Sequence, residues 1–150
     1  MMLSRQDIVA EACSWIGTPY RHQASLKGVG CDCLGLVRGV WRGVIGQEPE
    51  RAPPYAPDWA EASGGEALAL AAARHLIVVP LDRFAPGDVL LFRWREHLPA
   101  KHAAIVTSCG KDGADKMVHA HDGAAVAEVT IAPLWRRRLA YAFKFPGVGD

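Results

Sequence analysis

The sequence predicts an α+β fold in which helices near the N-terminus pack on an antiparallel β-sheet. Helical periodicity occurs in residues 4–46, whereas short apolar segments separated by turns occupy residues 86–145. Helices that precede a run of strands are typical of α+β proteins, because a parallel β-α-β array would alternate the two. The 150 residues, 50% of them hydrophobic and 22% charged, suffice for one domain with a substantial core. We therefore expect a single domain over residues 1–150.

The first helix is expected to begin near Ser4. Ser4 and Asp7 form an S-x-x-D pattern, which is a relative of the capping box. Apolar residues at positions 8, 9, 12, 13 and 16 then recur at helical spacing. The turn-forming segment Gly17-Thr18-Pro19 is expected to end this helix.

The second helix is expected to begin near Cys33, after a loop over residues 20–30. Its apolar face carries Cys33, Leu36, Val37, Val40, Trp41 and Val44. Asp32 is placed to cap the N-terminus of the helix, because an aspartate side chain accepts hydrogen bonds from the first-turn N–H groups. Gly46 is expected to stop the helix.

The remaining segments predict one more helix and then a series of strands. Four prolines in residues 47–58 indicate an irregular surface segment, and residues 66–75 fit a third helix. The turn Pro86-Gly87-Asp88 opens the second half. The expected strands are residues 89–92, 102–107, 116–121, 125–131 and 139–145. A short helical turn is expected within residues 135–139.

Cys33 is the candidate nucleophile among four cysteines, which are too few for a disulfide scaffold. A thiol in the first turn of a helix faces unpaired N–H groups and the positive end of the helix dipole. Both favour the thiolate, so we expect a lowered pKa at Cys33. The alternative is that Cys33 is a small buried hydrophobic residue, and that packing role is expected for Cys13, Cys31 and Cys109.

Two histidines are placed to work with this cysteine. His102 opens one expected strand and His119 lies on the next, so antiparallel pairing can bring them side by side. A helix N-terminus packed on the sheet would then set Cys33 against His102, giving a nucleophile, a base and an orienting group. His119 and His121 alternate on one strand and share a face, so His121 is a second candidate for the third position.

A zinc site is the competing interpretation of the same residues. Cys31-x-Cys33 and His119-x-His121 together supply four ligands that zinc accepts. Structural zinc sites usually use C-x-x-C spacing, however, and two cysteines that flank one position at a helix start point apart. We therefore favour catalysis without a metal or organic cofactor.

Charge and hydropathy exclude several classes of partner. The net charge of +1 gives no basic footprint for nucleic acid or an anionic membrane. No stretch approaches the roughly 20 apolar residues that span a bilayer. The N-terminal segment carries Asp7 and Glu11 and lacks the apolar run of a signal peptide, so we expect synthesis in the cytoplasm. Four of the five tryptophans, at positions 41, 59, 94 and 135, are expected to pack in the core or at its edge, with a glycan groove as the alternative.

Five motifs occur in the order found in the NlpC type of papain-like cysteine peptidases, which cleave peptidoglycan stem peptides. They are Gly17-Thr18-Pro19-Tyr20, resembling G-x-P-Y; Asp32-Cys33-Leu34-Gly35-Leu36-Val37, resembling D-C-S-G-L-V; Pro86 to Phe92, resembling P-G-D-L-V-F-F; His102 to Val106, resembling H-V-G-I-Y; and Met117 to Ala120, resembling the I-H-A strand. The sequence thus resembles this family over about residues 4–121, which implies a papain-like NlpC-type domain.

The resemblance assigns a role to each matching residue. Cys33 is the nucleophile, His102 the general base and His119 the group that orients His102. Tyr20 and Asp32 are implied near the substrate or the oxyanion, although Tyr20 can equally be a packing residue and Asp32 a simple N-cap. Leu34 replaces the usual serine after the cysteine, so any substrate contact from that hydroxyl is missing. The implied target is the D-γ-glutamyl-diaminopimelate bond of the stem peptide.

A narrower resemblance concerns the cell-wall peptidases encoded in phage tail modules and gene-transfer-agent clusters. The segments that carry it are residues 20–25, 53–59 and 92–95. It implies phage tail proteins as partners and delivery to the cell wall on a phage-like tail. The alternatives are a papain-like amidase or acyltransferase acting on another amide, and a zinc-binding or non-catalytic tail module.

Overall fold

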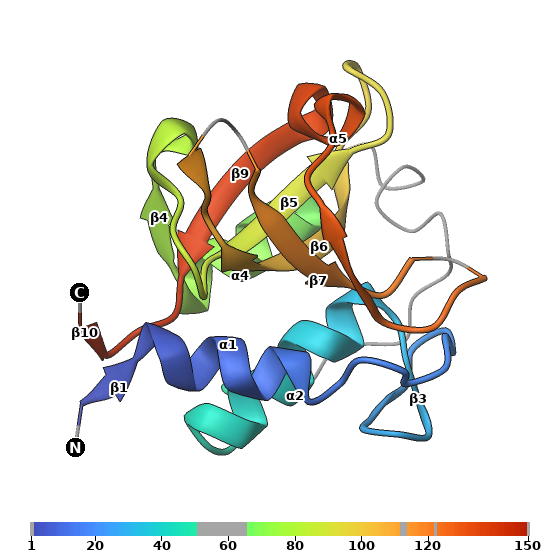
Figure 1. Cartoon of the computed structure of the whole chain (residues 1–150), viewed down its shortest axis with the longest axis vertical. Coiled ribbons are helices and arrows are strands. Elements are labelled where there is room, and N and C mark those ends of the chain that lie inside the picture. The colour runs from blue at the N-terminus through green and yellow to red at the C-terminus, as the bar shows by residue number, and fades with distance from the viewer. Residues whose placement is uncertain (1, 51–65, 112–113, 122, 150) are drawn as a thin grey trace.

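A six-stranded antiparallel sheet forms the centre of the protein in the computed structural model, which describes residues 2–50, 66–111, 114–121 and 123–149 (Figure 1). Its strands lie in the order β4-β9-β5-β6-β7-β8. Their bounds are β4 Ile77–Val79, β5 Val89–Arg93, β6 Ala100–Ser108, β7 Lys116–His119, β8 Ala127–Thr130 and β9 Leu139–Lys144. All neighbouring pairs are antiparallel. The predicted α+β class and antiparallel sheet are confirmed.

Helices pack at both ends of this sheet. Their bounds are α1 Arg5–Cys13, α2 Cys33–Val44, α4 Ala67–His75 and α5 Pro133–Arg138, with a 3-10 helix η1 at Leu81–Arg83. In Figure 1, α1 and α2 lie together below the sheet, whereas α5 lies at the opposite end. Two small ladders complete the fold, β1 Leu3–Ser4 with β10 Val148–Gly149 and β2 Ser25–Leu26 with β3 Gly30–Cys31. None of the described helices combines the length and hydropathy that a bilayer-spanning segment needs.

Helix α1 begins as the sequence predicts and ends earlier. The Ser4 side chain accepts a hydrogen bond from Asp7 N–H, and the Asp7 carboxylate accepts one from Ser4 N–H. The helix ends at Cys13, and a turn with φ of +93° at Gly17 follows. Arg5 anchors the helix to the turn before β5 by donating to Asp88 Oδ1 at 2.7 Å and to the Pro86 carbonyl at 3.1 Å.

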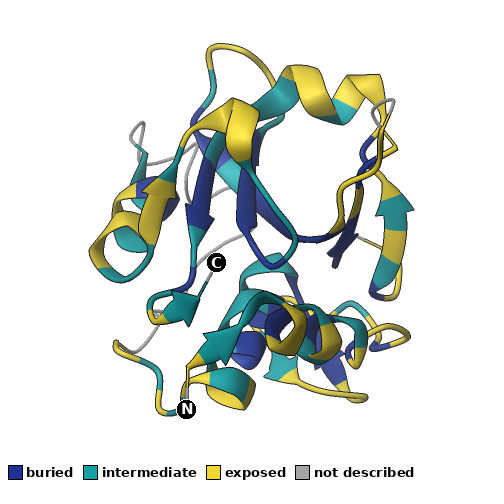
Figure 2. Ribbon diagram, turned by 60° about the vertical axis from the view of Figure 1, so that its left-hand side comes forward, coloured by how far each residue is buried: buried dark blue, intermediate teal, exposed yellow. Residues whose placement is uncertain are grey.

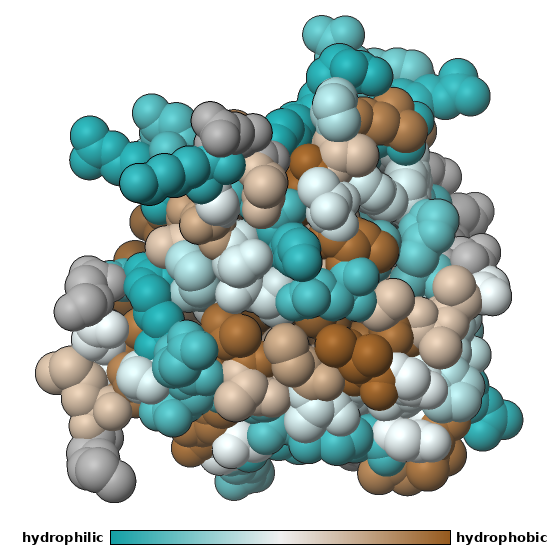
Figure 3. All heavy atoms as spheres, viewed as in Figure 1, coloured by the Kyte–Doolittle hydropathy of each residue, from teal (hydrophilic) through white to brown (hydrophobic). Residues whose placement is uncertain are grey.

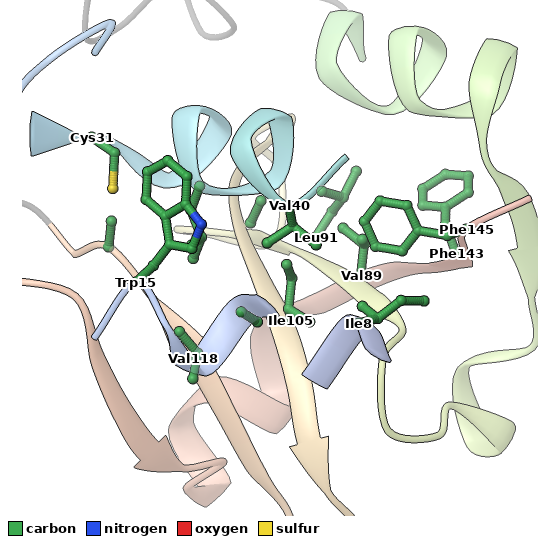
Figure 4. Close-up of a cluster of buried hydrophobic side chains, with 14 of the residues drawn as sticks. Ile8, Trp15, Cys31, Val40, Val89, Leu91, Ile105, Val118, Phe143 and Phe145 are labelled. Carbon is green, nitrogen blue, oxygen red and sulfur yellow. The ribbon is translucent and has the colours of Figure 1, made fainter. Parts of the chain in front are cut away.

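Helix α2 packs closely on the segment after α1. Leu36 and Val40 are fully buried, and Gly39 lies against the Trp15 ring so tightly that a Cβ at this position would collide with it. Figure 4 shows Trp15 and Val40 within the core that the helices share with the sheet. The absence of a side chain at Gly39 therefore sets the distance between this helix and Trp15.

The sheet buries both of its faces, because strand residues alternate between two clusters. On the helix side lie Val89, Leu91, Ala103, Ile105 and Val118. On the other side lie Leu90, Phe92, Ala104, Val106 and Met117. Figure 2 shows the central strands as buried and the helix surfaces as partly exposed. Burial on both faces explains why residues 89–92 are continuously apolar rather than alternating.

Some expected element bounds are wrong. The strand expected over residues 116–121 ends at His119, so His121 lies beyond it. The helical turn expected at residues 135–139 is α5, which begins at Pro133, and Leu139 already belongs to β9. The short edge strand β4 was not expected. The proline-rich prediction for residues 47–58 falls largely outside the described residues. Figure 3 shows that hydrophobic residues reach the surface among hydrophilic ones. Val78 of β4 is among the exposed hydrophobic residues of the chain.

Candidate active site

The Cys33 thiol lies against strand β6 at the peptide unit that joins Lys101 to His102. Cys33 is the first residue of α2, which packs on β6. Its Sγ atom is 3.7 Å from the Lys101 carbonyl oxygen. The backbone N–H groups of Ala103, Leu34 and Cys33 also stabilise negative charge on this sulfur. The helix start therefore carries the thiol to the strand that bears His102, with amide donors around it.

His102 and His119 form a buried imidazole pair. His102 Nε2 lies 2.9 Å from His119 Nδ1, and the two residues are 3% and 6% exposed. The register of β6 and β7 pairs Ile105 with Val118. This register puts His102 and His119 on the same sheet face as diagonal neighbours, within reach of each other. Antiparallel pairing brings the two histidines together as the strand pattern predicts.

His121 packs beside this pair without taking the hydrogen bond to His102. Its ring centroid lies 5.7 Å from that of His102 and 5.7 Å from that of His119, on which it stacks at an interplanar angle of 15°. The two candidates for the third position thus differ in geometry. His119 has the nitrogen–nitrogen contact with His102, while His121 contacts the pair through its ring face.

Two tryptophans enclose the histidines, and sequence reasoning did not place them there. Trp135, from α5, stacks on His102 with ring centroids 5.2 Å apart, and Trp94 lies 5.3 Å from the same ring. A weak signal for Trp94 is that it follows Phe92, the partner of His102, by two residues, although the register shift between Phe92 and Arg93 interrupts that alternation. Trp135 has none, because its contact depends on how α5 folds back over the sheet.

Burial favours the neutral forms of both Cys33 and His102. Desolvation, and after it the charges of His119 and His121, lower the pKa of His102 well below its usual value. Desolvation, with a smaller effect of Asp32, raises the pKa of the Cys33 thiol to about 12. The expectation of a lowered thiol pKa is therefore wrong, because burial outweighs the amide donors at the helix start.

Asp32 and Tyr20 lie beside the site in structural roles. Asp32 Oδ1 accepts a hydrogen bond from Gly35 N–H and Oδ2 accepts one from Gln23 N–H, both at 2.7 Å. The predicted N-cap is thus confirmed, and the second oxygen holds the preceding loop, where Gln23 has a positive φ of 66°. Tyr20 is partly buried and packs against the helix-side core next to the Cys31 backbone.

The other cysteines do not assemble a metal site. Cys31 is fully buried in the core that contains Trp15 (Figure 4), and burial raises its pKa to about 11. Within the described residues, no group of three or more His, Cys, Asp or Glu side chains is arranged to hold a metal ion. The zinc interpretation therefore has no ligand set there. Cys13 packs partly buried as expected, but Cys109 is exposed, so its expected packing role is wrong.

Solved structures with the same fold include two NlpC/P60 proteins and the protein Ly7917. An NlpC/P60 family protein from Bacillus cereus has a TM-score of 0.68 at 18% identity, covering 97% of this chain and 41% of its own. NlpC1 from Trichomonas vaginalis has a TM-score of 0.62 at 14% identity, covering 94% and 43%. Ly7917, solved with the hydrolysis product of MDP, has a TM-score of 0.55 at 13% identity, covering 95% and 63%.

These similarities establish a papain-like fold, and sequence establishes the family. The chain spans about two fifths of the length of the Bacillus cereus and Trichomonas vaginalis proteins. No curated protein matches the chain by sequence. The family model for NlpC/P60 matches residues 17–143, which contain the cysteine and all three histidines of the site. The chain therefore belongs to the NlpC/P60 family of cysteine peptidases, which generally act on the cell wall.

Proposed function

We propose that this protein is a cysteine endopeptidase of peptidoglycan stem peptides, with Cys33 as nucleophile, His102 as general base and His119 as the residue that orients His102. The observation that carries the proposal is the 2.9 Å contact between His102 Nε2 and His119 Nδ1, on the strand that the Cys33 thiol touches. A buried imidazole that contacts a second imidazole, on the strand whose backbone a thiol touches, supports nucleophilic acyl transfer.

The tautomers follow from this contact. His102 must present an unprotonated nitrogen to the thiol, so its proton lies on Nε2 and is donated to His119 Nδ1. His119 then carries its own proton on Nε2. The remaining nitrogen, His102 Nδ1, is the one that exchanges a proton with Cys33. His119 is neutral, since burial lowers its pKa to about 4, so it orients His102 without supplying negative charge.

The reaction then proceeds as general-base-assisted acyl transfer. The Cys33 S–H proton moves to His102 Nδ1 as the sulfur attacks the amide carbonyl carbon. His102 returns this proton to the amine as the C–N bond breaks, leaving a thioester on Cys33. Water then attacks the thioester while His102 takes its proton and passes it to the departing sulfur. Backbone N–H groups at the start of α2 are suited to hold the oxyanion.

The substrate bond and the route to the wall are finer parts of the proposal. The motif resemblance supports the D-γ-glutamyl-diaminopimelate bond, and the structural similarity to Ly7917 with its MDP-derived product agrees with a wall fragment as ligand. The phage-tail resemblance supports delivery on a phage-like tail. An amidase or acyltransferase that uses Cys33 and His102 in the same roles is the second candidate. Attack of the Cys33 sulfur on a carbonyl carbon is the same chemistry for an amide outside the cell wall.

Digestion of purified muropeptides, followed by mass spectrometry, tests the proposal. The wild type is expected to split the stem peptide at one bond, and Cys33→Ala is expected to release no fragment. Cys109→Ala is the matched control, because Cys109 is exposed and outside the site. Equal products from wild type and Cys33→Ala would contradict the assignment. Inactivity of the wild type on every muropeptide, with turnover of another amide, would favour the second candidate.

A further inference from the structure

His121 contacts all four rings that surround it, although the proposed mechanism assigns it no step. Its centroid lies 5.7 Å from those of His102, His119, Trp94 and Trp135. It is also the most exposed of the three histidines, since His102 and His119 are buried and His121 is partly exposed. His121 is therefore the imidazole of this cluster that is most open to solvent.

The surroundings of His121 contain positive charge and neutral rings. The titratable groups that face it are His102 from β6 and His119 from β7. Trp94 and Trp135 are neutral, and the Arg138 guanidinium of α5 lies 5.9 Å from the Trp94 ring centroid. Arg136 of the same helix is paired with Asp115. Among the described residues, no carboxylate forms an ion pair with any of the three histidines. The positive charge of a protonated His121 would therefore have no carboxylate paired with it among these residues.

We propose that His121 is an electrostatic positioning residue whose protonation suppresses proton transfer from Cys33 to His102. The proposal rests on the function proposed above for Cys33 and His102. With His121 neutral, His102 can become an imidazolium as the thiol proton arrives. With His121 protonated, the same transfer would place two positive charges on adjacent rings.

The distance sets the size of this effect. Two unit charges 5.7 Å apart at an effective dielectric constant of about 20 change a pKa by about 2 units. The equilibrium for the proton transfer then falls by about 100-fold, and a step in which the proton is half transferred slows by about 10-fold. The direction agrees with the structure, because the charge of His121 contributes to the lowered pKa of both His102 and His119.

Two substitutions isolate this charge. His121→Phe keeps a ring against Trp94 and Trp135 and removes the titrating group. His121→Gln is a smaller, polar variant that guards against misfolding of the first. His75→Phe is the matched control, because His75 lies on α4 beside Glu50, away from the cluster. Modification of Cys33 by iodoacetamide, followed by peptide mapping from pH 8 to pH 5, and muropeptide cleavage over the same range are measured for each protein.

The rate ratio of each His121 variant to wild type is expected to rise by about 10-fold from pH 8 to pH 5, and that of His75→Phe to stay constant. A constant ratio in both His121 variants would overturn the proposal, because a purely structural role lowers rates equally at every pH. Imidazole NMR of the wild type gives a readout without substitution. His121 is expected to take the first proton of the three, and first protonation of His102 or His119 would overturn the proposal. Failure of muropeptide cleavage alone would refute the proposed function and leave the other two readouts decisive for His121.

Discussion

The buried His119 imidazole should make the protein sensitive to mild acid. Burial, with a smaller effect of the charge on His121, lowers the pKa of His119 from 6.5 to about 4 in the folded state. The unfolded chain therefore binds more protons than the native state between these two values. Stability contributed by neutral His119 is complete above pH 6.5 and is lost as the pH falls towards 4. The shift of about 2.5 units means that the free energy of unfolding falls by about 3.4 kcal/mol in total once the pH is well below 4. About 1.4 kcal/mol of this is already lost at pH 5.5.

His119→Gln tests this reasoning, because glutamine cannot titrate but keeps an oxygen that can accept the proton of His102 Nε2. The free energy of unfolding is measured in urea at pH 7.5 and pH 5.5 for both proteins. The wild type is expected to lose about 1.4 kcal/mol more than the variant over this interval. His75→Gln, on α4, is the control and should follow the wild type. Equal losses in wild type and His119→Gln would refute the claim that His119 is held neutral by burial.

Three further predictions follow from other contacts. Iodoacetamide at pH 7.5 should modify exposed Cys109 faster than Cys33, because burial raises the pKa of the Cys33 thiol to about 12. Peptide mapping measures the two rates, and the reverse order would indicate a resting thiolate at Cys33. Gly39→Ala should lower thermal stability by about 1–3 kcal/mol, because the new Cβ meets the Trp15 ring, and a stabilised variant would show that the ring moves aside without cost. Arg5→Met should destabilise the protein by about 2 kcal/mol in urea unfolding, since it removes the ion-pair partner of the buried Asp88 carboxylate and leaves only the Ala85 N–H and the charge of Lys144 to stabilise it. A neutral result would mean that Asp88 takes up a proton instead.

Local patterns predicted the parts of the fold that depend on neighbouring residues. The Ser4–Asp7 capping box and the Asp32 cap are both present, because each is decided within one turn of helix. Strand alternation likewise anticipated that His102 and His119 would meet. The prediction extended the strand to His121, since no residue type marks its end at His119.

Features that depend on distant segments were not predictable in this way. The stacking of Trp135 on His102 requires α5 to fold back over the sheet, and no pattern within residues 133–138 encodes that contact. The prediction of a lowered pKa for the Cys33 thiol was wrong for a related reason. The helix start at Cys33 is visible in the sequence, but the burial that outweighs it comes from the packing of α2 against β6.

The neutral state of the site bears on how Cys33, the proposed nucleophile, would be activated. A stored thiolate–imidazolium pair needs an environment that favours both charges, yet His102 lies among rings and beside a neutral His119. A carboxylate in the third position would stabilise the imidazolium, whereas an imidazole only fixes its orientation. The backbone N–H groups around the Cys33 sulfur favour negative charge there and are suited to the oxyanion as well. Charge separation at this site is therefore expected to arise only with the substrate in place, when the S–H proton moves to His102 as the sulfur bonds to the amide carbonyl carbon and negative charge develops on the carbonyl oxygen.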